Sequence, residues 1–171
     1  NAWNLDGTVL RPGDLGANDV FGSPVTMSSD KLAVGARGDD GVGDGELESG
    51  VVYTYHFTGG AWVLDTTPVL RPGDLDAGDT FGISVAMSGD KLAVGAIYDG
   101  GVGNAESNAG AVYTYQFTGG AWVLDSTVLR PGGLDSNDFF GSSVAMSGDK
   151  LAVSARGDDD VSDDKPNAGA V

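Results

Sequence analysis

One stretch of sixteen residues occurs three times in the chain. FGISVAMSGDKLAVGA begins at Phe81, and close variants of it begin at Phe21 and Phe140. Arginines and tryptophans recur with the same spacing of 59 or 60 residues. A period of this length indicates a supersecondary unit that buries its apolar surface against its neighbours, so the chain must fold as stacked copies of one unit.

Each copy contains four short segments with the alternating pattern of β-strands. SVAMS and KLAVGA flank a two-residue turn, Gly89-Asp90, and GAVYTYQF follows at residues 110–117. AWVLDSTVL, residues 121–129, comes after a Gly-Gly turn. No window of a dozen residues shows the helical period without a glycine or proline in it. The pattern predicts an all-β fold made of four-stranded antiparallel units.

Four-stranded units at this spacing are typical of the blades of a β-propeller. Phe-Gly followed after about a dozen residues by Gly-Ala resembles the FG-GAP repeat of integrin α-chain propellers, and Ser154 replaces the glycine in the third copy. The chain is more similar to bacterial secreted FG-GAP proteins, in which GDxFGxSVAxSGD, VGA and GAVYTY recur in this order. The resemblance implies a propeller, commonly seven-bladed, on an extracellular or cell-surface protein.

Three repeats are too few to close a propeller ring. We expect residues 1–20 to supply a strand that completes a neighbouring blade, 21–80 and 81–139 to form two full repeats, and 140–171 a partial third. The chain is then an incomplete ring, a window of a longer array, or a unit whose ends complete one another head to tail in a ring or fibre. A separate three-blade monomer is disfavoured because it leaves strand edges open.

The composition excludes several classes of partner. Twenty-five acidic and nine basic side chains give a net charge of −16, which would repel nucleic acids and anionic lipid surfaces. No apolar run is long enough to span a membrane, and the chain opens on no leader sequence. The single histidine, His56, stands where the next copy has Gln116, and no nucleophile, zinc or phosphate-loop motif is present. We therefore expect a protein that is not an enzyme.

The loop after each Val-Gly-Ala or Val-Ser-Ala is rich in side-chain oxygens. Because Ca²⁺ takes six to eight oxygen ligands, these loops are candidate calcium sites, and a solvated acidic loop is the alternative. In integrin repeats the calcium loop lies between Phe-Gly and Gly-Ala, where this chain has only a tight turn, so the ligands of the family cannot be transferred. The candidates are Asp39, Asp40, Asp44, Asp99, Asn104, Asp158, Asp159 and Asp163.

A second set of aspartates, Asp19, Asp79 and Asp138, stands two residues before each Phe-Gly. We expect each to form an Asx-turn that positions the phenylalanine. Arg37-Gly38-Asp39 and Arg156-Gly157-Asp158 match the tripeptide that some integrins recognise, although so short a match arises easily in a chain rich in glycine and aspartate.

Recurring aromatic residues either fill the core between blades or, if exposed, stack on sugar rings. They are Trp3, Trp62, Trp122, Tyr53 and Tyr113. The sequence thus predicts a non-enzymatic, extracellular structural or adhesive repeat protein whose partners are copies of itself or further repeats, with calcium stiffening the loops. The alternative is a propeller, part of a larger surface protein, that binds glycans or cell-surface proteins.

Overall fold

The computed structural model of the chain describes residues 7–40, 48–65, 69–101, 103–159 and 167–171. These residues form β-strands, turns and loops, and they contain no helix. None of them therefore belongs to a long apolar helix of the kind that crosses a lipid bilayer. The all-β prediction is confirmed.

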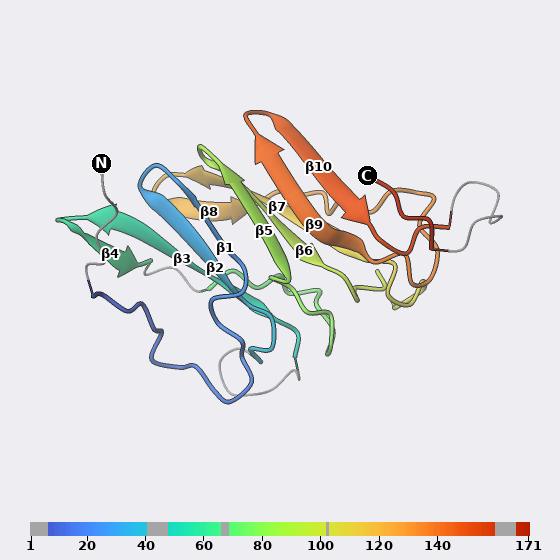
Figure 1. The fold of residues 1–171 in the computed structure, drawn as a ribbon, viewed down its shortest axis with the longest axis horizontal. Coiled ribbons are helices and arrows are strands. Elements are labelled where there is room, and N and C mark those ends of the chain that lie inside the picture. The colour runs from blue at the N-terminus through green and yellow to red at the C-terminus, as the bar shows by residue number, and fades with distance from the viewer. Residues whose placement is uncertain (1–6, 41–47, 66–68, 102, 160–166) are drawn as a thin grey trace.

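The strands form three antiparallel sheets, which we call blades 1, 2 and 3 (Figure 1). Blade 1 contains β1 (Val25–Ser28), β2 (Lys31–Ala36), β3 (Val51–Thr58) and β4 (Ala61–Leu64). Blade 2 contains β5 (Ser84–Ser88), β6 (Lys91–Ala96), β7 (Ala111–Thr118) and β8 (Ala121–Leu124). Blade 3 contains β9 (Phe140–Ser147) and β10 (Lys150–Ala155). In blades 1 and 2 the strands are paired in sequence order, as a propeller blade requires.

Tight turns fix the register within each blade. Gly89 and Asp90 join β5 to β6, so that Ser88 pairs with Lys91. Gly119 and Gly120 join β7 to β8 with φ angles of 61° and 86°, which glycine adopts at little cost. The sequence patterns locate β5, β6 and β7 to within a residue or two.

The segment 121–129 differs from its predicted form. The strand β8 ends at Leu124, and the chain returns to the sheet only at Leu129, which forms an isolated bridge with Val112 of β7. Alternation alone cannot distinguish one long strand from a short strand and a later single contact.

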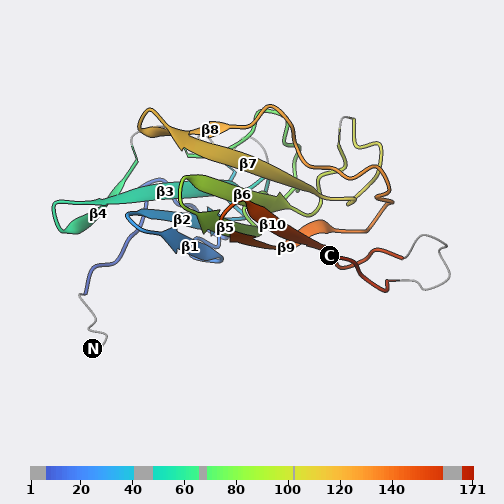
Figure 2. The same ribbon diagram turned by 90° about the horizontal axis from the view of Figure 1, so that it is seen from above.

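The blades lie side by side, with β1 next to β5 and β5 next to β9, so that blades 1 and 3 are the outer blades of the row (Figures 1 and 2). The described sheets do not close into a ring. Blade 2 is covered on both faces, and most of the largest apolar cluster belongs to it and to the contacts that its neighbours make with it. The core therefore lies between blades, as expected for a repeat whose units bury one another.

Candidate functional site

Successive blades meet through the backbone of paired glycines. A Cβ atom placed on Gly35 would lie 2.3 Å from the carbonyl oxygen of Gly82, and one on Gly95 would lie 2.3 Å from that of Gly141. Real Cβ atoms essentially never come within 3.0 Å of a neighbouring atom. The Gly-Ala of one repeat and the Phe-Gly of the next are therefore two halves of one contact.

Backbone hydrogen bonds extend this junction. Phe81 donates its N–H to the carbonyl oxygen of Ser49 at 2.8 Å, and Phe140 donates to Ala109 at 2.8 Å. The Phe81 side chain is fully buried and packs edge-on against Tyr113, with ring centroids 5.4 Å apart. Phe81 thus enters the core at the point where its own blade joins the preceding one.

The hairpin tips make a second set of contacts between blades. At each junction, the glycine of one tip donates its N–H to a serine hydroxyl of the preceding blade, and a lysine of the preceding blade pairs with the neighbouring aspartate. These contacts are Gly89–Ser28 and Lys31–Asp90 at the first junction, and Gly148–Ser88 and Lys91–Asp149 at the second. The two junctions are therefore built alike.

Asp39 and Asp99, two of the predicted calcium ligands, lie inside the structure. Tyr53 donates its hydroxyl to Asp39 at 2.7 Å, and Tyr113 donates to Asp99 at 2.7 Å. Arg130, from the segment that leads to blade 3, also donates to Asp99 at 2.7 Å. Burial, and then the bond to the aspartate, raise the pKa of both tyrosines. Each carboxylate thus links the residues after its own strand to the next strand of the blade. Asp99 also links them to the segment that leads to blade 3.

The other predicted ligands are spread along the loops. Asp40 accepts a hydrogen bond from the backbone N–H of Glu48, Asp159 accepts one from that of Asn167, and Asn104 donates to Asp76. Asp158 is partly buried, and Asp44 and Asp163 lie outside the described residues. In the described part of the chain, no three His, Asp or Glu side chains gather into a set able to hold a metal ion. Calcium binding stays a prediction.

The aspartates before each Phe-Gly hold a turn, but by a different bond from the one expected. An Asx-turn would accept the N–H two residues later. Each carboxylate instead accepts the N–H of the residue three positions earlier. The bonds are Gly16 to Asp19 (2.6 Å), Asp76 to Asp79 (2.8 Å) and Asp135 to Asp138 (2.7 Å). All three aspartates are buried, so the local role is structural, as the sequence suggested.

The burial of Asp79 makes the stability of the protein depend on pH. Burial raises the pKa of Asp79 to about 6 from 3.8, although the N–H of Asp76 opposes the shift. The folded chain therefore binds this proton more tightly than the unfolded chain. The resulting stability is present below pH 4 and is lost as the pH rises through 6.

We expect Asp79→Asn to raise the free energy of unfolding at pH 7.5 by up to about 3 kcal/mol, since the amide keeps an acceptor oxygen and carries no charge. At pH 4 the variant and the original chain should be almost equally stable. Urea unfolding at both pH values measures the difference. Asp135→Asn, an exposed carboxylate of the equivalent turn in the next repeat, is the control, and an equal gain there would mean that net charge alone is responsible.

The predicted aromatic residues lie mainly inside the blades. Tyr53 and Tyr113 are buried, Trp122 is buried, and Trp62 is partly buried. Each of the two described tryptophans packs edge-on against a phenylalanine of its own blade, Phe57 or Phe117. Trp3 lies outside the described residues.

Two further sequence features have local partners. In the Arg37-Gly38-Asp39 tripeptide the arginine is exposed while the aspartate is buried against Tyr53. His56 bonds Asp65 through Nδ1 at 2.6 Å, at the β3–β4 hairpin.

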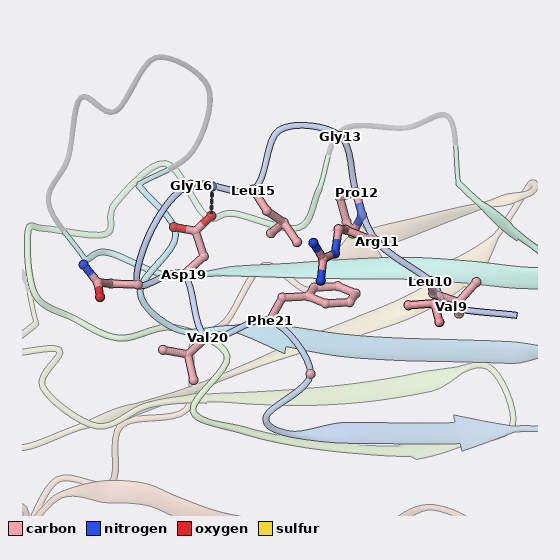
Figure 3. A pocket seen from close by; sticks show the side chains of 12 residues that line it. Val9, Leu10, Arg11, Pro12, Gly13, Leu15, Gly16, Asp19, Val20 and Phe21 are labelled. Atoms are coloured by element: carbon pink, nitrogen blue, oxygen red, sulfur yellow. Dashed lines mark hydrogen bonds between the residues drawn. The ribbon is translucent and has the colours of Figure 1, made fainter. Parts of the chain in front are cut away.

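Blade 1 presents an apolar surface on the side away from blade 2. We call this the open face, and its residues are Val9, Val20, Phe21, Val25 and Met27. Met27 is 61% exposed, whereas Met87, its equivalent in blade 2, is 8% exposed. A pocket of about 760 Å³ lies beside it, between residues 9 and 22, and Figure 3 shows Leu10, Arg11 and Phe21 along its wall.

The equivalent segments of blades 2 and 3 show which part of a preceding blade would fill this pocket. Residues 69–82 and 128–141 lie against the loop that precedes the third strand of the blade before them, through bonds such as Phe81 to Ser49. The pocket therefore lies where a preceding repeat would place that loop. Single-sequence reasoning missed the open face, because four of its five residues, all but Val20, recur in the three copies and only their neighbours differ.

The comparisons with known proteins agree with the repeat pattern. The family model of the FG-GAP repeat matches residues 6–55, 67–115 and 125–171, which together cover most of the chain. No curated protein matches the chain.

Proposed function

Because the chain belongs to the FG-GAP repeat family, we propose that it is a non-enzymatic structural or adhesive segment of an extracellular protein and that it works by docking one repeat on the next. The family is a family of β-propeller-type repeats, generally without enzymatic activity, and it typically occurs in extracellular proteins. Within that class, we propose that this chain acts through its row of blades.

The open face is the observation that carries this proposal. Val25 and Met27 are 55% and 61% exposed, on a strand whose equivalent in blade 2 is almost entirely covered. A contiguous apolar surface of this kind marks an interaction site. The equivalents of Phe21 and Met27 in blade 2, Phe81 and Met87, are buried at the first junction, so another repeat is the partner that fits this face best.

The polar residues of the chain support a structural role. Asp39 and Asp99 are buried carboxylates of the kind that active sites use, but each accepts a hydrogen bond from a tyrosine inside its blade, and Asp99 also accepts one from the partly exposed Arg130. His56 is bonded to Asp65 at a hairpin edge. We propose calcium only as an addition that stiffens the acidic loops.

Oxidation of methionine tests whether the open face is used. In the isolated 171-residue chain, we expect dilute peroxide to oxidise Met27 several-fold faster than Met87, because Met27 is exposed. In the protein purified from its natural source without denaturation, Met27 should be oxidised as slowly as Met87, because a repeat covers it. Mass spectrometry of the peptides measures both rates, and Met87 is the internal control.

If Met27 reacts as fast in the native material as in the isolated chain, the open face is uncovered and the proposed docking role is wrong. A glycan array is the matching test for the alternative of a sugar-binding propeller. A sugar that protects Met27 as well would place the ligand on this same face and would also count against repeat docking.

A further inference from the structure

The outward face of blade 3 differs from the faces that join the other blades. Ser154 of β10 pairs with Ser143 of β9, as Gly95 of β6 pairs with Ser84 of β5. The third repeat therefore has a side chain at the position where the first two repeats require glycine. The Ser154 hydroxyl lies 3.5 Å from the carbonyl oxygen of Ser143.

A fourth blade docked in the repeat geometry would collide with this side chain. At both internal junctions the carbonyl oxygen of the Phe-Gly glycine would lie 2.3 Å from a Cβ on the facing glycine. At the second junction, that oxygen also accepts a hydrogen bond from Ser84 at 2.7 Å, so its position is part of the contact. A backbone carbonyl cannot rotate away from the Ser154 Cβ as a flexible side chain could, so the whole incoming blade would have to shift away from blade 3.

We propose that Ser154 closes blade 3 to a following repeat in this geometry, and that the open face of blade 1 receives an FG-GAP repeat with glycine at the position of Gly35 and Gly95. This inference rests on the proposed function. Blade 3 of a second copy carries Ser154, so it is excluded as the partner of the open face.

The residues that make the hairpin-tip contacts have counterparts at the two outer faces. Blade 3 has Ser147 and Lys150 where the earlier blades use a serine and a lysine at the hairpin tip. Blade 1 has Asp30 as the partner for that lysine and Gly22 for the glycine contact, and Ser29 supplies the backbone N–H in place of the tip glycine.

The first test removes that Cβ from the full chain. We expect the unchanged chain and Ser154→Ala, which keeps the Cβ, to sediment as monomers. Ser154→Gly should associate head to tail, with a mass that rises with concentration to that of two or more chains. Adding Met27→Asp to Ser154→Gly should abolish the association, which shows that the open face is the surface used.

The second test moves the serine to an internal junction. Gly95→Ser recreates the Ser143–Ser154 pair in blade 2 and should release blade 3, so that peroxide oxidises Met146 several-fold faster. Met87 should stay protected, which shows that blades 1 and 2 remain folded and joined.

Three results would overturn the inference. They are association of the unchanged chain that Met27→Asp abolishes, association of Ser154→Ala equal to that of Ser154→Gly, and an unchanged rate of Met146 oxidation in Gly95→Ser. Each leaves the protection of Met27 in native material untouched, so this inference and the proposed function can fail separately.

Discussion

Gly110→Ala is expected to lower the free energy of unfolding by about 4 kcal/mol, because two costs add at this position. Gly110 has a φ angle of 91°, in the region that L-residues rarely adopt. A Cβ there would also lie 2.1 Å from the carbonyl oxygen and 2.5 Å from the nitrogen of Phe140. The substitution therefore strains the backbone and separates blade 3 from blade 2.

Gly120→Ala separates these two costs. Gly120 has nearly the same φ angle, 86°, but no neighbouring atom within 4 Å of the position that a Cβ would take. We expect this control to lose only about 1 kcal/mol, the cost of the conformation alone. Urea unfolding followed by circular dichroism measures both variants, and equal losses would mean that the approach of the blades contributes nothing.

Phe81→Ala and Phe21→Ala should differ widely, although the two phenylalanines occupy the same place in their repeats. Phe81 is fully buried and packs against Tyr113 and Tyr115, so its loss should cost about 3–5 kcal/mol. Phe21 packs edge-on against Tyr53 but is partly exposed on the open face, so we expect a loss of about 1–2 kcal/mol.

The same urea titration compares the two phenylalanine variants. A loss at Phe21 as large as that at Phe81 would show that the isolated chain already covers its open face. Because both variants remove the same atoms, the difference between them reports the environment alone.

The sequence predicts the blades well because their determinants are local. Glycine pairs at 59–60 and 119–120 impose the hairpins, and the alternation in residues 51–58 and 111–118 places the strands. Each strand and turn pattern then occurs in three copies, so that a pattern too weak to interpret in one copy becomes clear when the three are compared.

The candidate site depends on contacts between side chains that are separated in the sequence, which a single sequence does not display. Asp39 and Asp99 supply oxygens in a glycine-rich loop, as calcium ligands do, and nothing in the residue type reveals that a tyrosine on the next strand donates its hydroxyl to each of them. The signal that could have been used is the matched recurrence of Asp99, Tyr113 and Arg130 with their equivalents in the first repeat.

The open face was invisible for a related reason. Met27 and Met87 stand in nearly identical stretches, and their different exposure follows only from what lies beside each blade. Sequence repeats predict equal structures, but burial is a property of the neighbours.

The row of blades has a mechanical consequence. Since blades 1 and 3 are the two outer blades of the row, tension applied between them passes through both junctions in series (Figure 1). The second junction holds Arg130 against the Asp99 carboxylate and Ser84 against Gly141. At the first junction Arg71 bonds the neutral hydroxyl of Ser49, and proline stands at position 24 in place of Ser84. Under load blade 1 should detach first, leaving blades 2 and 3 joined as a pair.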